Sequence, residues 1–244
     1  MIVPRFTQDR CVILSDGSVE SLLACAMASE QQQLAGTQLN ANQSESSILL
    51  PSWWEWMQEI DLMISAVDPA VIRQASAYSL NIYPDLSVYP PDDQPTLVNS
   101  SIGSIQSRML LEAAQIALKS GIRKVVWPIR IMRPETQQSM DELVDEIGIT
   151  IDRAILASRL ASLDATQDTA VDVVIETPFV DLSNTQIADL AGDMAIPLES
   201  CWWQNARTLP NAQHRFEYWS IKSLRSSTQI ETKPFAHPSP QSLG

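Results

Sequence analysis

The feature that most constrains this chain lies near its start, between residues 11 and 24. Cys11–Leu14 is an apolar run, Ser15–Ser18 is a turn of small and polar residues, and a helix is expected over Ser21–Glu30. In such a unit the first N–H groups of the helix are unpaired and directed at the turn. The pattern therefore predicts a buried strand, a loop built like an anion-binding site, and a helix.

Two residues of this loop oppose phosphate binding. Asp16 places a carboxylate where a phosphate would lie, and Ser18 adds a Cβ atom where close approach of a backbone favours glycine. A carboxylate about 4 Å from a phosphate oxygen costs on the order of 4 kcal/mol at an effective dielectric of about 20. The loop therefore has the shape of a phosphate site but unfavourable charge.

The rest of the chain alternates between predicted strands and helices. Further strands are expected at Leu62–Val67, Val125–Trp127 and Val171–Ile175. Helices are expected from Asp68-Pro69 onwards, over Ser104–Ser120 ending at Gly121, over Glu135–Ala161 with a break at Gly148, and over Asn184–Met194 with Ser183 as N-cap. This alternation predicts an α/β fold, a mostly parallel sheet with helices on both faces, whose ligands bind beyond the carboxyl ends of the strands.

Length and composition suit a single domain. The chain has 244 residues, of which 45% are hydrophobic, enough for one large core. We expect one α/β domain over residues 1–232 and a flexible C-terminal tail over residues 233–244, where proline recurs without an apolar pattern.

Charge and cysteine content limit the partners and the compartment. The chain carries 29 acidic and 16 basic residues, a formal net charge of −13, so we expect no nucleic-acid partner. Cys11, Cys25 and Cys201 are odd in number and widely spaced, which is typical of a reducing cytoplasm rather than of a disulfide framework. No apolar stretch has membrane-spanning length and no signal pattern opens the chain, so we expect a soluble cytoplasmic protein with no membrane partner.

Two ordered motifs resemble a known family. Asp16–Ser21 (Asp-Gly-Ser-Val-Glu-Ser) is similar to the Ser-Gly-Gly-x-Asp-Ser loop of PP-loop ATP pyrophosphatases. Glu176–Ile187 (Glu-Thr-Pro-Phe-Val-Asp-Leu-Ser-Asn-Thr-Gln-Ile), followed by Ile196–Trp202, resembles the corresponding run of the 7-cyano-7-deazaguanine synthase (ExsB/QueC) family of queuosine biosynthesis. The resemblance implies an adenine nucleotide alpha hydrolase-like (PP-loop) fold and a divergent, QueC-like protein, with self-association into a homodimer as the family's habit.

The resemblance also implies a degenerate nucleotide site. In the family, the loop holds the ATP phosphates and its Asp helps to hold the metal ion. A Lys after the Leu-Ser pair neutralises phosphate charge. Here Glu20 stands at the position of the Asp, and Asn184 stands at the position of the Lys. The implied nucleotide-binding positions are Ser15, Asp16, Gly17, Ser18, Glu20, Ser21, Asp181, Ser183 and Asn184. Because these changes make the site more negative or neutral, we expect no ATP pyrophosphatase activity and no cofactor. A Mg²⁺ ion bridging Asp16 and Glu20 is the alternative that would retain ATP.

The family's structural zinc site has four cysteines, and only Cys201 matches one of them. His214 and Glu217 stand at two of the other positions, so that Cys201, His214 and Glu217 form a three-ligand alternative. We expect no zinc, and we identify no catalytic residue, since no other catalytic motif occurs in the sequence.

Three interpretations of function remain open. The first is a pseudoenzyme that binds a nucleotide-like or deazapurine-like ligand, or a partner. The second is an active ATP-dependent ligase that forms AMP and pyrophosphate while converting a deazapurine-like carboxylate to an amide or nitrile. The third is a structural subunit-interaction protein.

Overall fold

The structure is a computed structural model. It describes residues 10–36, 47–51, 60–83, 102–131, 139–164, 172–204, 206, 212, 213 and 215–220. The strands are β1 (Cys11–Ser15), β2 (Ile48–Pro51), β3 (Asn81–Ile82), β4 (Lys124–Val126) and β5 (Val174–Glu176). The helices are α1 (Val19–Gly36), α2 (Ile60–Tyr78), α3 (Ile102–Lys119), α4 (Met140–Asp164) and α5 (Asn184–Asp193), followed by the short 3₁₀ helices η4 (Leu198–Ser200) and η5 (Trp202–Gln204).

The five described strands form one parallel sheet with β1 at its centre. The strand order is β3-β2-β1-β4-β5, and every neighbouring pair is parallel. Val12 pairs with Ile48 on one side, and Cys11 pairs with Lys124 on the other. The predicted parallel sheet and the first strand are therefore confirmed, and the loop after Ser15 lies at the carboxyl end of the central strand.

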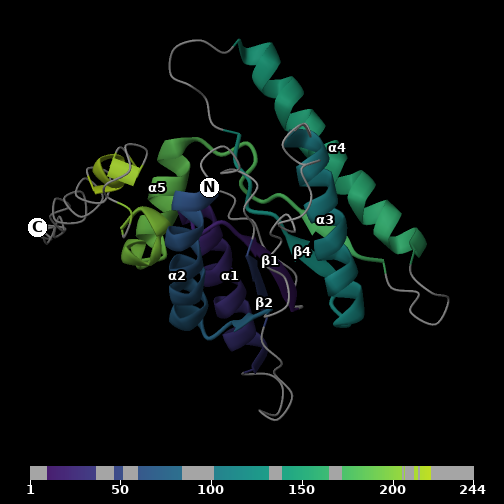
Figure 1. The fold of residues 1–244 in the computed structure, drawn as a ribbon, viewed down its shortest axis with the longest axis horizontal. Helices are drawn as coiled ribbons and strands as arrows, with labels where there is room; N and C mark the ends of the chain where they lie inside the picture. Colours follow the sequence, from purple (N-terminus) through teal and green to yellow (C-terminus); the bar gives the residue numbers. More distant parts are fainter. Residues whose placement is uncertain are drawn as a thin grey trace, which may run out of the picture.

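Both faces of the sheet are covered by helices (Figure 1). Cys11 and Ile13 of β1 pack into a core with α1, α2 and α5, whereas Val12 and Leu14 pack into a second core with α3 and α4. This split follows from the two-residue period of a strand, which sends successive side chains to opposite faces. Because both faces are buried, all residues of β1 are apolar or small, and all are buried.

The prediction of a second strand at Leu62–Val67 is wrong, because this segment belongs to helix α2. The strand next to β1 on this side is β2, Ile48–Pro51, which was not predicted. Likewise Pro69 lies inside α2 and does not open a helix. A short apolar run is compatible with a buried strand or a buried helix, and only tertiary pairing distinguishes the two.

The remaining predicted strands and helices are present in the structure, although some of them begin or end at other residues than predicted. The strands at β4 and β5 and the helices α1, α3, α4 and α5 are confirmed, although α1 extends to Gly36. The predicted break at Gly148 is wrong, because α4 continues through this residue. The predicted tail over residues 233–244 lies outside the described residues, so the domain limit at residue 232 stays a prediction. No helix in the described segments is long and apolar enough to cross a membrane.

Two glycines provide a test of backbone strain. Gly121 follows α3 with φ of 65°, whereas Gly148 is exposed inside α4, and a Cβ atom at either position meets nothing within 4 Å. We expect Gly121→Ala to lower the free energy of unfolding by about 1–2 kcal/mol, because the left-handed conformation is strained for L-residues. Gly148→Ala is expected to raise it by about 0.5–1 kcal/mol, because alanine is the better helix former. Urea unfolding of both variants measures this, and shifts in the same direction would contradict it.

Candidate functional site

The loop between β1 and α1 is a tight, buried turn. Asp16 and Ser18 are only 8% and 4% exposed, and Gly17 between them has φ of 75°. A positive φ is readily adopted by glycine, so Gly17 allows the sharp reversal from strand to helix. The loop therefore has the backbone shape that the sequence predicted.

The N–H groups of the loop donate to the loop's own side chains. The Ser18 N–H donates to Asp16 Oδ1 at 3.0 Å, and the Gly17 N–H donates to Ser15 Oγ at 3.2 Å. The Asp16 N–H donates to Ser21 Oγ at 3.2 Å, and the Ser21 N–H donates to Ser18 Oγ at 3.3 Å. Donors that would cradle a bound anion are thus engaged within the loop itself.

The Asp16 carboxylate is the anion at the centre of this arrangement. Besides the Ser18 N–H, Asp16 Oδ1 accepts a hydrogen bond from Ser21 Oγ at 2.5 Å. A carboxylate at a helix N-terminus is stabilised by the N–H groups and by the helix dipole, as a bound phosphate would be. The Asp16 carboxylate therefore lies where a phosphate would lie and accepts hydrogen bonds from groups that would bind it.

Neighbouring elements hold the loop in place. Gln74 of α2, which is fully buried, accepts from Ser15 Oγ at 2.9 Å and donates through Nε2 to the Ser18 carbonyl at 3.0 Å. The backbone N–H of Trp202, in η5, donates to the Gly17 carbonyl at 3.0 Å. Sequence reasoning missed Gln74, because its partner atoms lie far away along the chain.

A buried ion pair links α1 to the segment that follows β4. Arg130 Nε lies 2.6 Å from Glu20 Oε1, and the two side chains are only 5% and 8% exposed. Arg130 also donates through Nη1 to Asn184 Oδ1, at the start of α5. Arg130 thus brings Glu20 and Asn184 together, the two positions that the resemblance assigned to metal and phosphate chemistry.

Arg130 corrects the charge argument made from the sequence. The sequence indicated no cation near Glu20, whereas the structure places the guanidinium of Arg130 beside it. A signal for it was available, since Arg130 follows the apolar run of β4, where the carboxyl ends of parallel strands form ligand sites.

Two other predicted site residues have different surroundings. Ser183 is the N-cap of α5, and its Oγ accepts from the Gln186 N–H at 3.3 Å, while the Gln186 side chain accepts from the Ser183 N–H at 2.8 Å. This capping box confirms the predicted helix start and engages the hydroxyl of Ser183 in local structure. Asp181 is exposed to solvent.

The residues of the three-ligand zinc alternative are only partly described. Cys201 is fully buried, whereas Glu217 is exposed and accepts from Gln213 Nε2 at 2.9 Å. His214 lies outside the described residues. Within the described segments, no group of three His, Cys, Asp or Glu residues is arranged to hold a metal ion.

The three cysteines are free and buried. Burial raises the pKa of Cys11 to about 11 and raises the pKa of Cys25 and of Cys201 well above the ordinary value. The charges of Glu20 and Asp16 raise the pKa of Cys201 further. Cys201 is therefore held as a neutral thiol close to the loop, and a thiolate nucleophile is not expected there.

Comparisons with known proteins add little to this description. No known protein family matches the sequence, and no curated protein matches it. Among solved structures, the fold is similar to the U34-tRNA thiolase NcsA from Methanococcus maripaludis, a structure with a 4Fe–4S cluster, at a TM-score of 0.44 and 10% identity. The overlay covers 94% of this chain and 74% of that chain. A likeness this distant supports no conclusion about family or function.

Proposed function

We propose that this chain is a PP-loop-like protein without ATP pyrophosphatase activity, a pseudoenzyme of the QueC-like type that binds a nucleotide-like or deazapurine-like ligand, or a partner. The observation that supports this proposal best is the occupation of the loop's N–H groups by Asp16, Ser15, Ser18 and Ser21. Phosphoryl and adenylyl chemistry depend on positioning and charge neutralisation. A loop whose N–H groups donate to a carboxylate and to serine hydroxyls of its own supplies neither for ATP.

The active ligase is the second candidate, because Arg130 favours it. An arginine at this edge of the sheet is suited to binding carboxylates and phosphates in a bidentate manner. For this role Arg130 would have to leave Glu20 and Asn184, with which it is paired inside the protein. The pairing makes the pseudoenzyme the better supported proposal.

The test is calorimetric titration of the unmodified protein with Mg-ATP, combined with detection of AMP in the presence of a deazapurine carboxylate. We expect no binding at millimolar ATP and no AMP above background, because the N–H groups of Asp16, Gly17, Ser18 and Ser21 already donate to side chains of the protein. Micromolar binding, or steady AMP formation that depends on the carboxylate, would overturn the proposal and favour the ligase.

A further inference from the structure

The strongest unexplained feature outside the loop is the exposed surface of α4. Among the described residues, eight of the twelve large apolar side chains that are exposed lie on this helix: Met140, Val144, Ile149, Ile151, Ile155, Leu156, Leu160 and Leu163. Its inner face already packs against α3 and the sheet through Ala154, Ala157 and Ala161. Exposed apolar side chains gathered on one helix are typical of an interaction surface.

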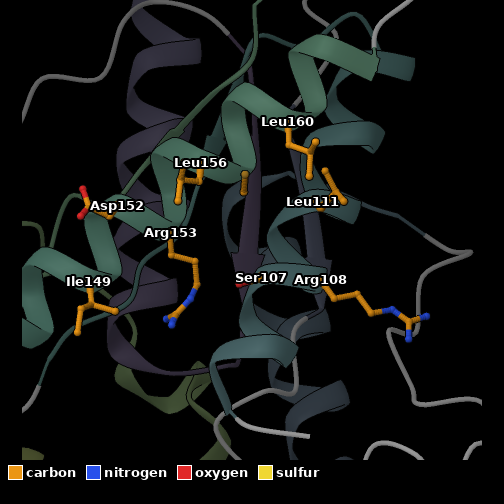
Figure 2. A pocket seen from close by; sticks show the side chains of 9 residues that line it. Ser107, Arg108, Leu111, Ile149, Asp152, Arg153, Leu156 and Leu160 are labelled. Carbon is orange, nitrogen blue, oxygen red and sulfur yellow. The ribbon is translucent and has the colours of Figure 1, made fainter.

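Part of this surface borders a groove of about 530 Å³ between α3 and α4. Ile149, Leu156 and Leu160 line it from α4, and Leu111 lines it from α3 (Figure 2). Leu156 is 63% exposed, and the spacing of seven and then four residues places the three side chains of α4 on one stripe. An apolar groove beside an exposed stripe is the kind of surface that an amphipathic helix covers.

Carboxylates share this side of α4 with the apolar side chains. Glu142 and Asp145 lie seven and four residues before Ile149, and Asp152 lies three residues after it, so they belong to the same side of the helix. All three are exposed. The stripe is therefore acidic towards the start of α4 and apolar towards its end, where Leu156 and Leu160 lie.

The two cations beside the groove are already engaged within the protein. Arg153 is half-buried and donates through Nη1 to Gln106 Oε1 of α3. Arg108 Nε lies 3.0 Å from Glu112 Oε1 on the same helix. By contrast, Asp145 and Asp152 form no ion pair with any other residue that the structure describes. These carboxylates are available to an incoming cation.

The charge of α4 indicates which occupant fits. The helix has six carboxylates and two guanidinium groups, a net charge of −4, and the whole chain carries −13. A second copy of α4, an anionic membrane and a nucleic acid would each bring further negative charge against this surface. A partner that combines apolar side chains with positive charge is complementary to it in both respects.

From this pattern we infer that the side of α4 that borders the α3/α4 groove is a docking site for a basic amphipathic helix of a partner protein. The apolar side chains of the partner pack against Leu111, Leu156 and Leu160, and its Lys or Arg side chains face Asp145 and Asp152. Burial of apolar surface supplies the affinity, and the charges select the partner. The inference does not rest on the proposed function, because α4 supplies no residue of the loop.

The probe is a labelled synthetic peptide of about 18 residues, with leucine at every third or fourth position and lysine beside the leucines. Fluorescence anisotropy follows its titration with the full chain, and we expect a dissociation constant on the order of 10 μM. Two control peptides are expected to bind at least about tenfold more weakly. One has glutamate in place of lysine, and the other has the same residues in an order without helical spacing.

A substitution in the groove locates the site on α4. Leu156→Gln is expected to weaken binding of the lysine peptide by about tenfold, because it removes apolar surface while glutamine remains a good helix former. Ile72→Gln is the matched control, since Ile72 is 54% exposed on α2, which covers the opposite face of the sheet. Circular dichroism spectra unchanged from the parent chain verify that each variant is folded.

Removal of charge tests the acidic part of the stripe. Asp145→Asn combined with Asp152→Asn is expected to weaken binding of the lysine peptide by about fivefold or more and to reduce its dependence on salt. Asp189→Asn combined with Asp193→Asn removes two exposed carboxylates from α5, on the opposite face of the sheet, and is expected to leave binding unchanged.

Several results would overturn the inference. These are no binding of the lysine peptide, equal binding of a control peptide, or an equal effect of an α4 variant and its control. If Leu156→Gln dissociates a homodimer in sedimentation equilibrium, a second copy covers the surface and the inference is wrong. The same holds for a membrane if Leu156→Gln abolishes flotation of the chain with vesicles of phosphatidylcholine and phosphatidylserine.

Discussion

Arg130→Met is expected to lower the free energy of unfolding by about 3–5 kcal/mol, because it leaves the Glu20 carboxylate buried without its cation. The pair is shielded from solvent, with Arg130 Nε 2.6 Å from Glu20 Oε1, and Arg130 also donates to Asn184. Loss of the arginine therefore loosens the contact of the segment after β4 with α1 and α5, next to the loop. Urea unfolding monitored by circular dichroism measures the effect.

A second ion pair of the same chain provides the control. Arg108 and Glu112 of α3 form an exposed i, i+4 pair at 3.0 Å, with side chains 53% and 28% exposed. We expect Arg108→Met to cost less than about 0.5 kcal/mol, because water screens an exposed pair. We also expect Glu20→Gln combined with Arg130→Met to recover part of the loss, since the buried charge is then removed. Equal losses for Arg130→Met and Arg108→Met would show that the buried pair has no special role.

Opening the loop is expected to strengthen the binding of anions. Asp16→Ser removes the carboxylate and frees the Ser18 N–H, and Ser18→Gly frees the Ser21 N–H. We expect the double variant to bind Mg-ATP and inorganic pyrophosphate at least about tenfold more tightly than the unmodified chain, because each regained hydrogen bond to a charged group contributes about 1.5–3 kcal/mol. Calorimetric titration with both ligands measures the gain, and pyrophosphate separates phosphate binding from adenine binding.

Arg130 changes what is expected of a lysine at position 184. From the sequence, Asn184→Lys restores a missing cation, but Asn184 Oδ1 accepts a hydrogen bond from Arg130. A lysine would place two cations together, so we expect Asn184→Lys to add little affinity to the double variant and to lower its stability.

The control for net charge is Asp189→Ser, which removes one exposed carboxylate from α5 and leaves the loop unchanged. If Asp189→Ser raises pyrophosphate affinity as much as Asp16→Ser does, the gain comes from overall charge, and the proposed role of the loop is wrong.

Local sequence was sufficient for the features that depend on neighbouring residues. The strand Cys11–Leu14, the turn at Gly17, the end of α3 at Gly121 and the cap at Ser183 could all be predicted, because each depends on side chains within a few positions. The anion-site shape of the loop and the conflict introduced by Asp16 follow from the same short-range logic.

Tertiary structure decided what the sequence left ambiguous. Leu62–Val67 has the composition of a strand, yet it is helical, because β2 and not this segment pairs with β1. Gln74 contacts Ser18 of the loop across 56 residues of chain, and Arg130 contacts Glu20 of α1 across 110 residues, separations at which no sequence spacing indicates contact. Whether the Asp16 carboxylate repels a ligand or accepts hydrogen bonds from the loop depends on where the N–H groups of the loop lie in the folded protein. The sequence alone determined which residues form the loop. The packing of α2, of the segment after β4 and of α5 around it determined that the N–H groups of the loop donate to its own side chains.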